Sequence, residues 1–205
     1  MGLSEWALVA VGVLAVAAWA LWVQASRVDR LHRTVLRSRT TLEAQLVRRA
    51  TAATELAGCG VLDPAEALIV TDVALRAIDA APVGLVRDGL EGRPEADALA
   101  APPPDPAGGP RVDRGLLESE LSRTLRAVLG ADEERAELAE DPRARDVLAQ
   151  LDQAWYRLQL ARRFHNAHVQ QVRRIRARSV VRVFHLAGRA PLPEPFDMDD
   201  ARPQH

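Results

Sequence analysis

The 205-residue sequence contains no lysine, a single cysteine and few aromatic residues. All 27 basic residues are arginines, and 28 acidic residues balance them to a formal net charge of −1. This balance excludes a polyanion-binding role for the molecule as a whole. The lone cysteine, Cys59, excludes an intramolecular disulfide and fits a reducing compartment. Aromatic residues make up only 4% of the chain, whereas Ala, Leu, Val, Arg and Glu dominate, and this composition favours helices over sheets.

Patterns that identify enzymes are also lacking. Gly108-Gly109 lies in proline-rich coil, whereas a phosphate-binding glycine loop joins a strand to a helix. None of the serines has the flanking glycines of a nucleophile elbow, and Cys59 has no histidine nearby in the sequence. His165 and His168 have a spacing that suits two metal ligands on one helix, but no further ligands complete the set. We therefore predict no enzymatic activity and no catalytic, cofactor-binding or metal-ligating residue.

The longest uncharged run lies near the N-terminus. Residues 6–23 carry no charge over 18 positions, and a helix of this length covers roughly 27 Å, close to the hydrocarbon thickness of a bilayer. Tryptophan rings prefer the headgroup layer, and arginines follow the run at once. We predict that residues 6–24 are a transmembrane anchor and that residues 1–5 are a short tail outside the cell. The residues that would fix the anchor at its ends are Trp6, Trp19, Trp22, Arg27 and Arg30.

A cleaved signal peptide is the alternative interpretation of this run. The sequence favours an uncleaved anchor, because Glu5 is the only charge before the run and because the run exceeds the usual apolar region of a signal peptide. Arginines at positions 27, 30, 33, 37 and 39 follow it. The positive-inside rule then predicts a single-pass protein of the cell membrane, with its N-terminus outside and its body in the cytoplasm.

The body begins with two predicted helices. Residues 24–57 contain no Pro or Gly, and their apolar residues recur mostly three, four or seven positions apart, as in an amphipathic helix. This helix can continue unbroken from the anchor, and Gly58 ends it. Asp63 and Pro64 begin the second helix as N-cap and first helical residue. Residues 25–81 are therefore predicted to supply the first two helices of a bundle.

Proline and glycine are dense in residues 82–111, which we predict to be a disordered loop. Helical patterns resume from Arg114 to Leu129 and in an acidic stretch at 133–140. The last helix starts at Asp141-Pro142 and is predicted to reach residues 180–186, where 180–184 is the only candidate strand. Residues 112–188 supply these remaining bundle helices. Prolines 191, 193 and 195 make residues 189–205 an extended C-terminal tail.

These elements predict an all-α fold, in which an N-terminal transmembrane helix leads into an antiparallel bundle of three to four long helices. Asn166 on the last helix is placed to hydrogen-bond across to a neighbour and so to fix register. The predicted buried stripe comprises Val28, Leu31, Val35, Leu42, Leu46, Leu68, Val73, Leu75, Leu121, Leu125, Leu148, Leu151, Trp155, Leu158, Val169 and Val172.

Charge is segregated along the second half of the chain. Residues 113–152 carry eleven acidic residues, whereas residues 153–193 carry nine arginines and no acid. One interpretation is internal, with an acidic helix lying beside the basic one. Another is an exposed basic face that touches anionic headgroups. Nucleic acid is the weakest partner, because aromatic residues that could stack on bases are few. The candidate contacts with an anionic surface are Arg173, Arg174, Arg176, Arg178 and Arg182.

The layout resembles the LemA family, which has a short outside tail, one N-terminal span and an elongated helical bundle. The similarity lies in residues 30–49, with a basic pair after a leucine-rich stripe, and in residues 161–169, where basic residues precede an aromatic residue, Asn166 and Val169. Pro195-Phe196 is similar to an aromatic near the C-terminus of the family. The resemblance implies a helical fold and a membrane location, and it implies no catalytic activity.

Two functions from different classes follow from the sequence. The first is a membrane-tethered scaffold or interaction protein, in which the helical rod presents a surface to an unidentified cytoplasmic protein. The second is a peripheral sensor or binder of anionic lipid through the Arg-rich last helix. The sequence names neither the partner nor the process.

Overall fold

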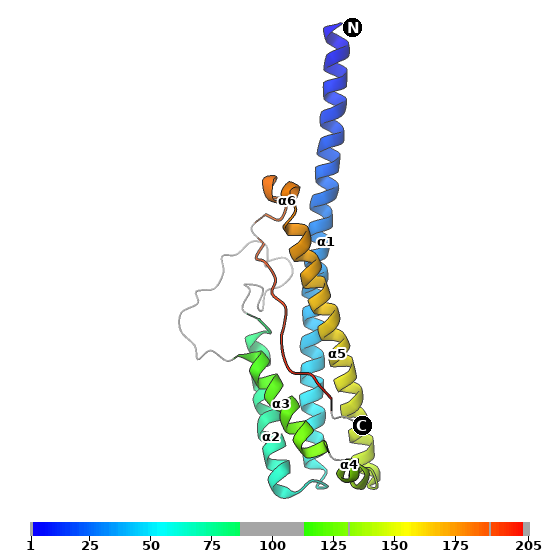
Figure 1. The fold of residues 1–205 in the computed structure, drawn as a ribbon, viewed down its shortest axis with the longest axis vertical. Coiled ribbons are helices and arrows are strands. Elements are labelled where there is room, and N and C mark those ends of the chain that lie inside the picture. Colours follow the sequence, from blue (N-terminus) through cyan, green and yellow to red (C-terminus); the bar gives the residue numbers. More distant parts are fainter. Residues whose placement is uncertain (1, 87–112, 131, 189, 203–205) are drawn as a thin grey trace.

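The computed structural model describes residues 2–86, 113–130, 132–188 and 190–202, and within these ranges every regular element is helical. The predicted all-α class is therefore confirmed. The long helices α1, α2, α3 and α5 alternate in direction and pack along one another over the lower part of the molecule (Figure 1). Most of the predicted loop at 82–111 lies outside the described residues.

Helix α1 (Leu3–Gly58) is one unbroken element of 56 residues, about 84 Å long. Its N-terminal part projects alone beyond the other helices (Figure 1), and the side chains described there up to Ala20 are all exposed. It is the one helix among the described residues that is long and apolar enough to cross a membrane. From Val28 onward one face of the same helix is buried against the bundle.

Helix α2 (Pro64–Asp79) and helix α3 (Arg114–Leu129) form a hairpin against the far end of α1. Both begin at the residues that the sequence predicts, because an aspartate caps each first turn. Asp63 Oδ1 accepts from the backbone N–H of Ala65 at 2.9 Å, and Asp113 Oδ1 accepts from Leu116 at 3.2 Å. A 3-10 turn, η1 (Ala81–Val83), follows α2.

Helix α5 (Pro142–Arg176) runs antiparallel to α1 along most of the bundle, after the short helix α4 (Asp132–Leu138). The prediction that it reaches residues 180–186 is wrong, because α5 ends at Arg176 and a separate helix α6 (Ser179–Val183) follows. Residues 180–183 are helical, so the candidate strand is also wrong. After α6 the chain turns through His185 and Gly188, whose φ angles of 50° and 57° lie in the left-handed region.

The core is built mainly of Leu, Val and Ala, with Trp155 among its largest buried side chains. Most of the predicted stripe is buried, but Leu68 and Leu75 are 71% and 45% exposed. The buried face of α2 differs from the predicted one, because its smaller residues face the bundle and let α1 and α3 approach closely. The buried residues of α2 are Val70, Val73, Ala74 and Ala77.

The C-terminal segment, defined here as residues 190–202, forms no helix and lies along the bundle (Figure 1, red). It is nevertheless part of the core. Phe196 is 1% exposed and Met198 is buried, and both pack with Leu42, Leu46 and Leu158. The segment therefore covers apolar surface that the helices alone would leave open to water.

Candidate functional site

The predicted anchor residues all lie on the projecting part of α1 or just beyond it. Trp6, Trp19 and Trp22 are exposed, as are Arg27 and Arg30. None of the described residues of the bundle covers the apolar surface of residues 8–20. This part of the helix has a surface suited to lipid, and the basic residues that follow it mark the point where the bundle begins.

The five predicted anionic-surface arginines do not share one environment. Arg174, Arg178 and Arg182 are exposed, whereas Arg173 and Arg176 are half-buried. Arg176 donates to the backbone carbonyls of Ala190 and Pro191, at 2.9 and 2.7 Å. Burial lowers the pKa of this guanidinium. The structure therefore brings three of the five to the surface and uses Arg176 to hold the start of the C-terminal segment.

Next to Arg176 lies a buried histidine of α1, His32, whose Nε2 atom has no hydrogen-bond partner among the described residues. Burial is the main cause that lowers the pKa of His32 below 6.5. The positive charge of Arg176 lowers it further, and Asp29 acts in the opposite direction. The folded protein therefore holds this imidazole neutral where an unfolded chain would protonate it.

We expect acidification to destabilise the bundle through His32. The folded-state pKa lies below the unfolded value of 6.5, so the unfolded chain binds more protons and the free energy of unfolding falls as the pH drops through about 6.5. His32→Gln should remove part of this fall in denaturant titrations of the full chain in detergent. The control is His185→Asn at an exposed turn, which should keep the wild-type pH dependence. Equal pH dependence in wild type and His32→Gln would contradict the assignment.

The basic face of α5 finds some of its acidic partners in the C-terminal segment. Arg162 pairs with Asp200 at 2.8 Å, and Arg126 of α3 pairs with Asp199. The hydrogen bond from Arg126 is the main cause that lowers the pKa of Asp199. Asp152, the last acid of residues 113–152, pairs with Arg135 of α4 and not with an arginine of residues 153–193. Internal pairing is thus present, although it runs largely through a segment that the sequence pattern did not implicate.

Hydrogen bonds from side chains of the bundle to the backbone of the C-terminal segment fix its register. Asn166 donates to the carbonyl of Phe196 and accepts from its N–H, both at 2.9 Å. The predicted cross-bond of Asn166 therefore exists, and its partner is the C-terminal segment. Trp155 and Gln159 both donate to the carbonyl of Asp200, at 3.0 and 2.8 Å. A side chain in place of Gly115 would collide with the backbone carbonyl of Asp197, so this glycine lets the segment lie close to α3.

A buried ionic network, which sequence reasoning missed, links α1 to α3. Glu118 is 0% exposed and accepts from Arg49 and from Arg114, each at 2.9 Å. Arg49 also donates to Ser122 Oγ at 2.7 Å, and its guanidinium lies 5.4 Å from the ring centre of Trp155. Burial lowers the pKa of Arg49, while the charge of Glu118 opposes that shift. The network therefore balances two buried cations mainly against one buried carboxylate.

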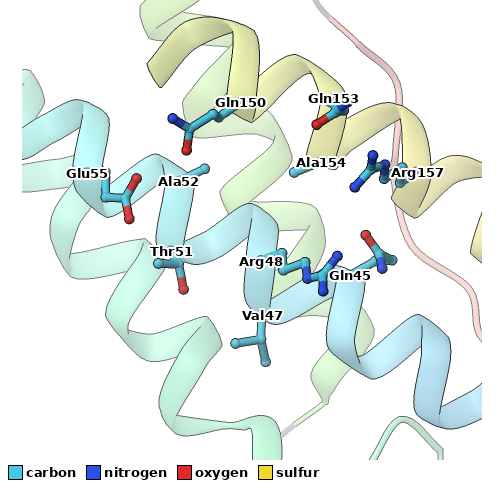
Figure 2. A pocket seen from close by; sticks show the side chains of 10 residues that line it. All are labelled: Gln45, Val47, Arg48, Thr51, Ala52, Glu55, Gln150, Gln153, Ala154 and Arg157. Carbon is cyan, nitrogen blue, oxygen red and sulfur yellow. The ribbon is translucent and has the colours of Figure 1, made fainter. Parts of the chain in front are cut away.

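An open groove of about 290 Å³ lies between α1 and α5 (Figure 2). Arg48, Gln45 and Arg157 lie toward one end, and Glu55 and Gln150 lie toward the other. Polar and small apolar side chains line the groove, and its lining holds no histidine or cysteine. Among the described residues no group of three or more His, Cys, Asp or Glu side chains could hold a metal ion. The groove is thus an open feature of the rod surface.

No protein-family profile, no curated protein sequence and no solved structure matches this chain. The resemblance to the LemA family stays a prediction.

Proposed function

We propose that this chain is a membrane-tethered helical interaction protein, similar in plan to the LemA family. Residues 6–24 anchor it in the cell membrane, the N-terminus lies outside, and the bundle lies in the cytoplasm. The observation that carries the proposal is the continuity of α1, which is apolar and exposed in its first part and packed into the bundle in its second. A bundle attached in this way is held next to the bilayer.

The exposed residues of α2 and α3 support a role in binding another protein. Leu68, Ile69 and Leu75 of α2 and Leu116 of α3 are all exposed at the part of the bundle far from the projecting helix. Four large apolar side chains left in water on these two helices favour a contact with another protein. Cross-linkers of several lengths should therefore join the full chain to a recurring partner, and their failure to do so would contradict the interaction function.

The topology is tested by labelling Cys59 with a membrane-impermeant thiol reagent. This side chain is half-buried at the C-terminal end of α1, far from the projecting N-terminal part. We expect no labelling in intact cells and full labelling after permeabilisation and denaturation. A Cys59→Ser variant supplies the background. Strong labelling in intact cells would reverse the proposed orientation and place the bundle outside.

A second candidate function is contact with an anionic membrane surface. It is favoured by the exposure of Arg174, Arg178 and Arg182 at the end of the bundle nearest the projecting helix. Arginines at such a position attract anionic lipids. Contact with the bilayer that ignores both anionic lipid content and salt would contradict this function.

A further inference from the structure

We propose that α6 and the end of α5 form a second membrane contact, at which Val180, Val183 and Phe184 enter the interfacial layer while nearby arginines bind anionic headgroups. The inference rests on the proposed membrane tether and gives its second candidate function a specific site. The occupant is the lipid surface itself. Packing into the core does not account for these exposed side chains, since the buried residue of α6 is Val181.

The position of α6 along α1 supports this assignment. Val181 is buried in one cluster with Ile175 and with Val28 of α1. Val28 follows the predicted end of the anchor at residue 24 by about one turn, or about 6 Å. Figure 1 shows α6 at the end of the bundle from which α1 projects. With residues 6–24 in a bilayer, α6 therefore lies at the depth of the headgroups.

The outward side of α6 is apolar. Val180, Val183 and Phe184 are 49%, 69% and 55% exposed. Val180 and Val183 lie three positions apart on one face of α6, and Phe184 follows directly as the C-cap residue. Isolated exposed apolar residues are common on soluble proteins, but two on a short helix and a third at its C-cap, next to a candidate span, are the pattern of an interfacial element.

Charge on the neighbouring surface complements anionic lipid. Arg174, Arg178 and Arg182 are exposed and spaced four apart, and the sequence contains no acidic residue from 153 to 193. An arginine side chain can lay its apolar stem along the interface and keep its guanidinium at the phosphates. The site therefore combines apolar insertion with phosphate binding, which is how amphipathic helices hold a membrane surface.

The test places an environment-sensitive fluorophore on a single cysteine of the full chain. In the Cys59→Ser background, Val183→Cys labels the outward face of α6. In the otherwise native chain, Cys59 labels the far end of α1, about 46 Å along the helix from Val28. Both proteins are reconstituted in vesicles of mixed phosphatidylcholine and phosphatidylglycerol that carry brominated lipid. We expect blue-shifted emission and severalfold stronger quenching at position 183 than at position 59.

Equal, water-like signals at the two positions would overturn the inference. Quenching of the intrinsic tryptophan fluorescence separates this failure from a failure of the tether, since Trp6, Trp19 and Trp22 are exposed on the span whereas Trp155 is buried in the bundle and supplies an unquenched background. If these rings are quenched and position 183 is not, the anchor stands and the α6 contact is refuted. If neither is quenched, the tether itself is refuted, and with it the α6 contact.

A separate variant tests whether the arginines contribute to this membrane contact. Replacing Arg174, Arg178 and Arg182 together by Gln should reduce the quenching at position 183 severalfold in vesicles with phosphatidylglycerol. Added salt should reproduce this loss with the native arginines. Replacing the exposed Arg48, Arg143 and Arg157 together is the matched control and should change nothing. Quenching that is indifferent to the first triple variant, to salt and to lipid charge would overturn the headgroup part of the proposal.

Discussion

Replacing Glu118 by Gln should destabilise the bundle by about 3–5 kcal/mol, because it removes the carboxylate that pairs with two buried arginines. Arg49 and Arg114 are almost fully buried, and each donates to Glu118 at 2.9 Å. Without this acid, two guanidinium groups remain in a low-dielectric site and repel each other. Denaturant titration of the full chain in detergent, followed by far-UV circular dichroism, measures the loss in the free energy of unfolding.

Two further variants test this explanation. Arg49→Met should cost less than Glu118→Gln, because Glu118 keeps its bond to Arg114 and no unpaired charge remains. Glu120→Gln is the matched control on the same helix. Its partner, Arg76, lies at the surface, where solvent screens the pair, so little change is expected. A larger loss with Arg49→Met than with Glu118→Gln would show that packing and hydrogen bonds of Arg49, not charge balance, dominate the site.

Phe196→Ala should release the C-terminal segment and cost about 3–5 kcal/mol. The ring is 1% exposed and packs against leucines from α1 and α5, so its removal leaves a cavity and weakens the segment's main apolar contact. Hydrogen exchange should speed up at the amides of Phe196 and Asp199, which donate to Asn166 and Ser119 in the native structure.

Phe164→Ala is the control, because this phenylalanine lies on α5 and is 60% exposed. It should leave both stability and exchange of the C-terminal segment near wild-type values. Equal stability of Phe196→Ala and Phe164→Ala would mean that the segment covers the bundle without contributing to its folding.

The helix starts could be predicted because their signals are local. At Asp63 and at Asp141, the aspartate that caps the first turn is followed directly by a proline at the first helical position. The continuity of α1 was also predictable, since no Pro or Gly interrupts residues 24–57. The end of α5 was not. Val180, Val181 and Val183 are β-branched and weaken a helix only slightly, and the contact of Val181 with Val28 helps fix the separate position of α6.

The candidate site could be predicted only in part, because some of its contacts are local in the sequence and others depend on the packing of distant segments. The arginine spacing on α5 was visible, but the burial of Arg176 depends on the carbonyls of Ala190 and Pro191, which reach it through a turn. Glu118 and Arg49 are 69 positions apart, and nothing in the sequence separates this acid from its exposed neighbour Glu120. Long-range pairs of this kind are set by the packing of the helices, which the periodicity of each helix leaves open.

The unbroken course of α1 makes the candidate membrane span and the bundle one lever. From residue 24 to Gly58 the helix extends about 51 Å without a joint. A change of roughly 10° in the tilt of the span, well within the range that bilayer thickness imposes, would sweep the far end of the bundle through about 9 Å. Under the proposed anchoring, a change in membrane thickness would therefore move a partner that is bound at that end.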